Sequence, residues 1–247
     1  MKILVIGGTG LIGSEVSKKL ITEGHEVIIG APSKGVDVIS GKGLAEALKG
    51  TEVVIDLSNS SSPDDETALN FFRSAGKNLV SYEKEAGVKH HLVLSIVGTD
   101  RAQYIGYLKA KTEQEENIKR SGIPYTIIRS TQFYEHVTTI ITVQGVDNEV
   151  HVSTVDYQPI AAADVVKYVS YFALKEPRNE TVEIAGPDQD LMTRFVQKYL
   201  DYKRDSKVVI GNNQNRYMHL DIPKDLLVPL GDCHKGNITF EEWLKVH

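Results

Sequence analysis

The sequence predicts an α/β protein with a doubly wound, mostly parallel sheet. In the first half of the chain, short β-branched runs alternate with longer segments of helical periodicity. Such alternation is typical of strands that pair in parallel through helical crossovers. The early strands are apolar almost throughout, as in KILVIG at residues 2–7 and EVVIDLS at 52–58. A strand that is covered on both faces has this composition because it leaves no side to solvent.

The expected elements follow in order along the 247 residues. Strands are expected at residues 2–7, 26–31, 52–58, 90–97, 124–129, 150–154 and 180–185. Helices are expected at residues 11–23, 44–49, 66–86, 107–121, 163–175 and 189–200. After residue 130 the pattern is less regular. We therefore expect a regular first part at 1–130 and a smaller irregular part at 131–247, interleaved with the last sheet strands and packed over the edge where open α/β sheets bind ligands.

The composition excludes several classes of protein. The chain has 28 Lys+Arg against 33 Asp+Glu and lacks the basic clusters that phosphate contact requires, so no nucleic-acid partner is expected. The single cysteine, Cys233, excludes a disulfide framework, and no histidine has zinc-site spacing, so no metal is expected. Adjacent His90 and His91 should point to opposite faces of a strand. Without a signal peptide or a stretch of ~20 apolar residues, the chain is expected to be cytoplasmic, with no membrane partner.

The first strand leads directly into a glycine-rich turn at residues 7–13, GGTGLIG, followed by an amphipathic helix. Its spacing G-x-x-G-x-x-G is a variant of the dinucleotide fingerprint. The early glycine permits the tight turn, the middle one lets the backbone approach a diphosphate, and the last lets the helix pack against the strand. The N–H groups and the dipole at the helix start then stabilise phosphate charge. The expected cofactor contacts here are Gly7, Thr9, Gly10, Leu11, Ile12 and Gly13; the alternative is a glycine-rich turn without a ligand.

Five segments carry a family resemblance: ILVIGGTGLIG at 3–13, HLVLSIVGTD at 91–100, GIPYTIIRSTQFYE at 122–135, QPIAAADVV at 158–166 and ITFEEWL at 238–244. In these segments the sequence resembles the short-chain dehydrogenase/reductase superfamily, in its atypical branch of NmrA-like NAD(P)-binding proteins. The resemblance covers essentially the whole chain. It implies a Rossmann-like fold and an NAD(P) cofactor.

The end of the second strand bears on which cofactor is expected. An NAD site usually has an acidic residue there to hold the ribose 2′-OH, but this chain continues Ala31-Pro32-Ser33-Lys34. Lys34 can pair with a 2′-phosphate, and the Ser33 hydroxyl can donate a hydrogen bond to it. NADP(H) is therefore favoured weakly over NAD(H). The alternative reading of Lys34 is a solvated turn residue.

The region around the adenosine departs from the family pattern. Relatives usually have a further strand ending in Gly-Asp, whose aspartate reaches the adenine, whereas residues 35–41 here are compressed and hold no Gly-Asp. By resemblance, Leu57, Ser58 and Asn59 would lie along the adenosine and ribose. Asn59 is equally consistent with an ordinary turn residue. In the following loop, Asp64 or Asp65 is expected to cap the next helix.

A Tyr-x-x-x-Lys pair is the candidate catalytic motif. Hydride transfer to a carbonyl requires a proton donor, and i,i+4 spacing places a tyrosine and a lysine on one helical face, where the lysine charge lowers the tyrosine pKa. Chance alone gives about one such pair in this composition, so position decides. Tyr107 opens the helix after the strand that carries Ser95, and Lys111 follows. By resemblance, Ser95 orients the substrate carbonyl. The alternative is a packed tyrosine, a solvated lysine and a serine that caps a strand.

The resemblance also implies a substrate pocket after the strand at 124–129. Its candidate residues are Gln132, Phe133, Tyr134 and His136. The two aromatic rings can stack on a flat substrate, and His136 can act as a second acid or base. The alternative reading is aromatic packing in the core beside an exposed histidine.

Two functions are consistent with these features. The first is an NAD(P)H-dependent oxidoreductase of the atypical short-chain type that reduces a small carbonyl or quinone-like substrate. The alternative is a non-catalytic NmrA-like redox sensor that binds the dinucleotide and acts through a protein partner, because many atypical members keep only cofactor binding. Neither the substrate nor the oligomeric state is indicated by the sequence.

Overall fold

The computed structural model describes residues 1–62, 64–212, 216–217 and 220–247, and over these residues the chain forms two compact units. The first unit comprises Met1–Arg129 and Val165–Val182, and the second comprises Ser130–Asp164 and Glu183–His247. The first boundary lies next to the expected division at residue 130. Residues 165–182 nevertheless return to the first unit, so the second unit is assembled from two separate stretches of chain.

The main sheet, as far as the chain is described, has seven strands in the order β14-β9-β5-β4-β3-β1-β2. The strands are β1 (Lys2–Ile6), β2 (Glu26–Gly30), β3 (Val53–Asp56), β4 (His90–Ile96), β5 (Tyr125–Ser130), β9 (Glu180–Ala185) and β14 (His234–Lys235). The pairs β1–β2, β1–β3, β3–β4 and β9–β14 are parallel. This arrangement confirms the predicted α/β class with a mostly parallel sheet.

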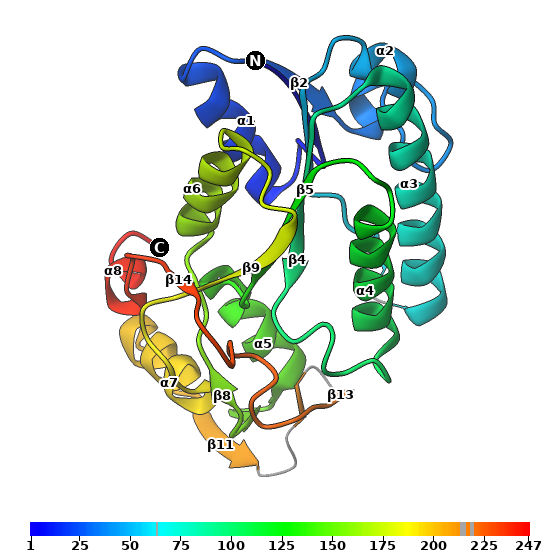
Figure 1. Cartoon of the computed structure of the whole chain (residues 1–247). Helices are drawn as coiled ribbons and strands as arrows, with labels where there is room; N and C mark the ends of the chain where they lie inside the picture. Colours follow the sequence, from blue (N-terminus) through cyan, green and yellow to red (C-terminus); the bar gives the residue numbers. More distant parts are fainter. Residues whose placement is uncertain (63, 213–215, 218–219) are drawn as a thin grey trace. The chain divides into compact units, whose positions relative to one another are not determined.

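Helices cover both faces of the sheet. α1 (Leu11–Thr22) and α6 (Ala162–Ala173) lie on one side, and α3 (Asp65–Ala86) and α4 (Gly106–Lys119) lie on the other (Figure 1). Asp64 caps α3, because its side chain accepts a hydrogen bond from the Thr67 amide at 2.9 Å. Of the two candidate caps, Asp64 is therefore the one used.

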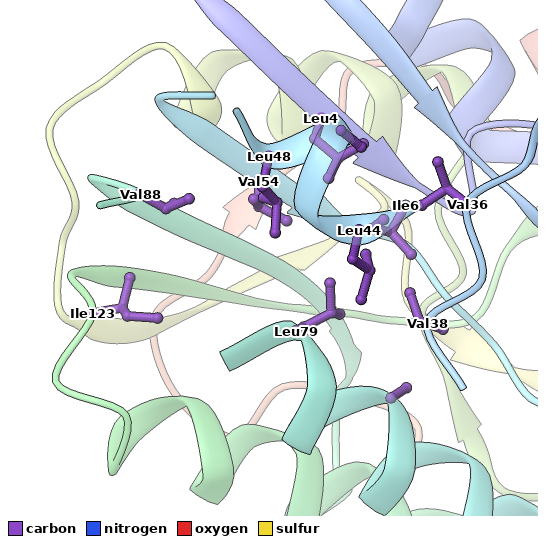
Figure 2. Packing of buried hydrophobic residues seen from close by; sticks show 12 residues of the cluster. Leu4, Ile6, Val36, Val38, Leu44, Leu48, Val54, Leu79, Val88 and Ile123 are labelled. Carbon is purple, nitrogen blue, oxygen red and sulfur yellow. The ribbon is translucent and has the colours of Figure 1, made fainter. Parts of the chain in front are cut away.

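The core against β1 and β3 includes residues from the region after β2, which forms no strand. Leu4 and Val54 face α2 (Leu44–Leu48) and Leu79 of α3 (Figure 2). Val36 and Val38 complete this cluster from the loop after β2. The compressed segment at 35–41 thus supplies two buried side chains instead of a further strand. β2 is left as the last strand of the sheet.

The second unit is built from short elements. They are η2 (Tyr134–His136), α5 (Val137–Gln144), β6 (Gly145–Val146), β7 (Glu149–Ser153), β8 (Asp156–Tyr157), β10 (Asp190–Leu191), α7 (Met192–Lys203), β11 (Val208–Asn212), β12 (Arg216–Tyr217), β13 (Leu220–Asp221) and α8 (Phe240–Leu244). The strand expected at 150–154 exists as β7, but it pairs with β6 and β11 instead of joining the main sheet. Across the described parts of the chain, no helix has the length and apolar character needed to span a bilayer.

Candidate functional site

The glycine turn has the close contacts that its sequence predicts. Gly7 has a φ of +73°, in the left-handed region that favours glycine. A Cβ at Gly7 would lie 2.5 Å from the Leu57 carbonyl oxygen, and a Cβ at Gly13 would lie 2.2 Å from the Gly7 carbonyl oxygen. The Gly7 amide donates to the Gly30 carbonyl at 2.9 Å. Two of the three glycines are therefore required by contacts between β1, β3 and α1.

The third glycine leaves the start of α1 open. Gly10 is the N-cap, has an extended conformation (φ −79°, ψ 179°) and makes no side-chain cap. The first amides of a helix have no partner within it, so those of Leu11 and Ile12 remain available to a ligand. Thr9, Gly10 and the Leu11 side chain are exposed. This is the geometry in which a helix start binds the phosphates of a dinucleotide.

The end of β3 lies against this turn and holds an unsatisfied hydroxyl. The Ser58 Oγ is buried and has no hydrogen-bond partner in the described structure. The Ser58 amide donates to Asp56 Oδ1 at 2.9 Å, which fixes the backbone there. A buried hydroxyl without a protein partner is unfavourable unless a ligand or an ordered water satisfies it. With the open helix start, this hydroxyl fits a ligand that carries phosphates and sugar hydroxyls.

Ser33 and Lys34 occupy a short 3-10 turn, η1 (Pro32–Lys34), that follows β2. Both side chains are exposed, whereas Ala31 before them is buried. The nearby carboxylate of Asp37 accepts hydrogen bonds from the Ile39 amide and the Ser40 hydroxyl, so it is engaged in its own turn. Along the sequence, Lys34 is the first positively charged residue after the end of β2.

Tyr107 lies in the first turn of α4 and is half-buried. Its hydroxyl donates to Asn59 Oδ1 at 2.7 Å. Its ring meets Phe72 edge-on, with the centroids 6.2 Å apart. Burial raises the pKa of the Tyr107 phenol, and the hydrogen bond with Asn59 offsets part of that rise. The structure thus brings together one expected catalytic residue and one expected cofactor contact.

Lys111 is buried one helical turn further along α4. Its ammonium donates to the Leu94 carbonyl at 2.9 Å and to Gln114 Oε1 at 2.5 Å. It also lies over the Phe72 ring, 4.8 Å from the centroid. Burial lowers the pKa of Lys111 to about 8, although the Asp56 and Glu115 carboxylates act in the opposite direction. The solvated lysine considered as the alternative is not what the structure contains.

Ser95 is buried in β4, and its hydroxyl donates to Glu115 Oε1 at 2.5 Å. Glu115 also accepts two hydrogen bonds from Arg129, at 3.0 and 2.7 Å, and Arg129 contacts Asp100 at 2.7 Å. The Ser95 hydroxyl proton is therefore already used by a buried carboxylate. Within the described chain, no hydrogen bond joins any two of Ser95, Tyr107 and Lys111.

Sequence reasoning missed the polar residues that hold this region together. Gln114 Nε2 donates to Asp56 Oδ2 at 2.7 Å, so Gln114 connects the end of β3 with Lys111. Its spacing from Lys111, i to i+3, places both on one helical face and was the available signal. Glu115 and Arg129 carried no comparable signal, because their pairing depends on how β5 meets α4.

In the second unit, the segment expected to line a pocket divides into two parts. The rings of Phe133 and His136 pack together with centroids 5.3 Å apart, and both residues are half-buried. Burial lowers the pKa of His136, and the neighbouring Glu135 charge opposes this, so the neutral imidazole is favoured. Gln132 Oε1 accepts a hydrogen bond from the Tyr217 hydroxyl at 3.2 Å. These three expected residues keep accessible surface or polar contacts.

Tyr134 has a different position. Only 1% of it is exposed, and its ring packs against Phe240 and Trp243, with centroids 5.1 and 5.8 Å away. Its neighbour Glu135 accepts a hydrogen bond from Trp243 Nε1 at 3.0 Å. Tyr134 therefore belongs to the aromatic core of the second unit, as the alternative reading described. Among the described residues, no group of three His, Cys, Asp or Glu side chains is placed to hold a metal ion.

Comparisons with known proteins agree with this geometry. Residues 7–176, more than half of the chain, match a family model described as NAD(P)H-binding. The photosystem II assembly factor Ycf39 of Cyanophora paradoxa is 26% identical over 204 residues, covering 75% of this chain but only 64% of that relative's length.

Solved structures share the fold. The dTDP-4-dehydrorhamnose reductase of Bacillus anthracis in complex with NADP has a TM-score of 0.74 at 16% identity, covering 90% of this chain and 88% of that one. The NADPH-dependent quinone oxidoreductase QOR2 of Escherichia coli, complexed with NADPH, has a TM-score of 0.68 at 20% identity, covering 92% and 86%.

Proposed function

Because the chain belongs to the NAD(P)H-binding family, of the atypical short-chain dehydrogenase/reductase type that its sequence resembles, we propose that it is an oxidoreductase that reduces a small carbonyl or quinone-like compound. The observation that carries the proposal is the glycine turn. Its backbone is packed so closely at Gly7 and Gly13 that only glycine fits, while Gly10 leaves the start of α1 open. A turn that binds no ligand does not need the open helix start at Gly10.

The cofactor is a nicotinamide dinucleotide, and NADP(H) is the proposed preference. The turn at 7–13 holds the diphosphate, and Ser58 with its neighbours Leu57 and Asn59 lies along the ribose and adenosine. Lys34 and Ser33 hold the 2′-phosphate, since both are exposed at the end of β2. When bound, the nicotinamide supplies the hydride.

Tyr107 is the proposed proton donor to the substrate oxygen. Lys111 keeps a positive charge within one helical turn of the phenol and favours the phenolate that remains after proton transfer. Ser95 can donate to the substrate only if its hydroxyl rotates away from Glu115. In the second unit, Gln132, Phe133 and His136 are the proposed substrate contacts, and Tyr134 supports them from the core.

A redox sensor without catalysis is the second candidate, and one observation favours it. The hydroxyl of Ser95 and the ammonium of Lys111 are both engaged by protein groups inside the first unit. If Ser95 and Lys111 serve to stabilise the first unit, the chain keeps its dinucleotide site but does not use these residues on a substrate. It would then pass its signal to a protein partner.

Cofactor binding is tested by titrating NADPH and NADH calorimetrically into the wild type and Gly10→Ala. The substitution is compatible with the φ of −79° at residue 10, and the new Cβ meets only the Gly7 carbonyl oxygen, at 3.3 Å. We expect at least about a tenfold loss of affinity, because the methyl group separates the backbone from the diphosphate. Gly231→Ala is the matched control, since nothing lies within 4 Å of its added Cβ. Equal affinities in the two variants contradict the assignment.

Catalysis is tested by following absorbance at 340 nm with a panel of carbonyl compounds and quinones. Tyr107→Phe is expected to lower turnover by about a hundredfold or more while nucleotide affinity is retained. Tyr104→Phe, at an exposed tyrosine just before α4, serves as the control. Full activity of Tyr107→Phe contradicts the acid assignment. Tight nucleotide binding without turnover of any panel compound favours the sensor.

A further inference from the structure

The hydrogen bond of Tyr107 differs from what the Tyr-x-x-x-Lys spacing predicts. Lysine at i+4 is expected beside the phenol, yet the Lys111 ammonium donates to the Leu94 carbonyl and to Gln114. Both side chains contact Phe72, Lys111 over the face of the ring and Tyr107 edge-on. The phenol hydroxyl instead donates to Asn59, at 2.7 Å, which is an ordinary length for a good O–H···O hydrogen bond.

Asn59 is held in place for this contact. Its Oδ1 also accepts a hydrogen bond from the Ser60 amide at 2.9 Å, which restrains the side chain against its own backbone. Three residues earlier, Asp56 accepts hydrogen bonds from the Ser58 amide and from Gln114 of α4. The end of β3 is therefore tied to α4 twice, through Asp56 to Gln114 and through Asn59 to Tyr107.

The helix supports the same arrangement. Tyr107, Lys111 and Gln114 are spaced i, i+4 and i+7, so they share one face of α4. That face is directed at the end of β3, as the contact of Gln114 with Asp56 shows. Within this set, Asn59 is the partner of the phenol, while Gln114 is the partner of the ammonium.

We propose that Asn59 is the positioning residue for Tyr107: its carboxamide holds the phenol hydroxyl in place, whereas the Lys111 ammonium is bonded to Leu94 and Gln114. This rests on the proposed function, in which Tyr107 gives its proton to the substrate oxygen and remains as phenolate. A carboxamide suits both states, because its oxygen accepts from the phenol and, after rotation of the amide, its NH₂ group donates to the phenolate. Asn59 thus acts through Tyr107 and does not itself touch the substrate.

The test is ¹⁹F NMR of protein labelled with 3-fluorotyrosine, in which fluorine lowers the phenol pKa into the range where the protein stays folded. Tyr107→Phe identifies the Tyr107 signal by its loss. Asn59→Asp places a carboxylate beside the hydroxyl, so the midpoint of the Tyr107 titration is expected to rise by about one pH unit or more. Ser61→Ala, at an exposed serine of the same loop, is expected to leave it unchanged. A titration that does not move in Asn59→Asp overturns the proposal.

A kinetic measurement distinguishes positioning from a simple cofactor contact. In Asn59→Ala we expect kcat to fall about tenfold, and KM for the nucleotide, along which Asn59 also lies in the proposed site, to rise by a smaller factor. A rise in nucleotide KM with unchanged kcat overturns the positioning role. The NMR experiment needs neither nucleotide nor turnover, so loss of nucleotide binding or absence of activity counts against the proposed function, and the titration decides separately on Asn59.

Discussion

The imidazole of His91 and the carboxylate of Glu83 form a buried pair, with His91 Nδ1 2.9 Å from both carboxylate oxygens. Both side chains are almost completely buried, 2% and 0% exposed. Burial alone lowers the pKa of His91, but the charge and hydrogen bond of Glu83, with the more distant Asp56, raise it above its ordinary value. His90, on the opposite face of β4, bonds Thr126 instead, so the two histidines diverge as their alternation predicts.

This pair predicts a pH dependence of stability. His91 binds its proton more tightly in the folded chain, so its contribution is complete below about pH 6.5 and is lost as the pH rises through the folded pKa. We expect the free energy of unfolding, measured in urea from pH 6 to 9, to fall across this range. In Glu83→Gln that fall should be reduced, whereas Glu85→Gln, at an exposed position of α3, should keep it. Equal slopes in wild type and Glu83→Gln contradict the prediction.

The neighbouring His90 predicts the opposite slope at lower pH. Burial, followed by the effect of His91, lowers the pKa of His90 to about 4. The unfolded chain therefore binds the proton more tightly, and stability is lost as the pH falls from about 6.5 toward 4. His90→Gln is expected to flatten this part of the urea profile. His151→Gln, at an exposed histidine of β7, is the control and should leave the slope as in the wild type.

The buried Glu115–Arg129 pair predicts an unequal effect of two carboxylate substitutions. Glu115 is fully buried and accepts hydrogen bonds from both Arg129 and Ser95, whereas half of the Asp100 side chain is exposed. Glu115→Gln leaves a buried guanidinium without its main partner and is expected to lower the free energy of unfolding by about 3–5 kcal/mol. Asp100→Asn is expected to cost about 1 kcal/mol or less. Urea denaturation measures both, and a larger effect at Asp100 would refute the ranking.

The proposed role of Lys34 predicts a preference for NADPH over NADH. Lys34→Ala removes the positive charge proposed for the 2′-phosphate, so affinity for NADPH should fall about tenfold while affinity for NADH stays unchanged. Lys18→Ala, at a largely exposed lysine of α1, is the matched control. Calorimetric titration of the two nucleotides measures the difference. Parallel losses for NADPH and NADH would show that Lys34 does not read the 2′-phosphate.

We predict that the C-terminal segment unfolds in a local step. Trp243, the only tryptophan of the chain, can report this step through its fluorescence. Asp164 is buried and accepts hydrogen bonds from the amides of Asn237 and Ile238, both at 2.9 Å. Asp164→Ala removes two charge-assisted hydrogen bonds, so the free energy of unfolding of this segment should fall by about 3 kcal/mol. The red shift of Trp243 fluorescence should therefore occur at a lower urea concentration. Thr239→Ala, which removes the α8 cap, should cost about 1 kcal/mol. An unshifted transition in Asp164→Ala contradicts this anchor.

The fold of the first unit was predictable because its strands are short apolar runs and its helices are strongly periodic. The second unit was harder. α5 (Val137–Gln144) is rich in β-branched residues, which favour strands, and it was not expected as a helix. Burial of Val137 and Ile140 on one helical face outweighs a propensity difference of well under 1 kcal/mol per residue.

The parts of the candidate site that depend on backbone packing could be predicted from the sequence. The hydrogen-bond partners of its side chains were harder to predict. The roles of Gly7 and Gly13 follow from spacing, because the turn has room for nothing larger. The partners of Ser95 and Lys111 depend on the distance between β4 and α4, which spacing along the chain does not contain. Tyr134 was expected to face a ligand, but its place beside Trp243 depends on residues more than a hundred positions away.

The path of the backbone limits how this protein can be divided or recombined. Since the chain passes from one unit to the other after residues 129, 164 and 182, no single cut separates them. A fragment ending at Arg129 lacks residues 165–182, which belong to the first unit and contain most of α6 and the start of β9. Grafting a foreign second unit requires three junctions instead of one. New specificity on this scaffold is therefore expected to arise through point changes or loop insertions, and not through exchange of a terminal module.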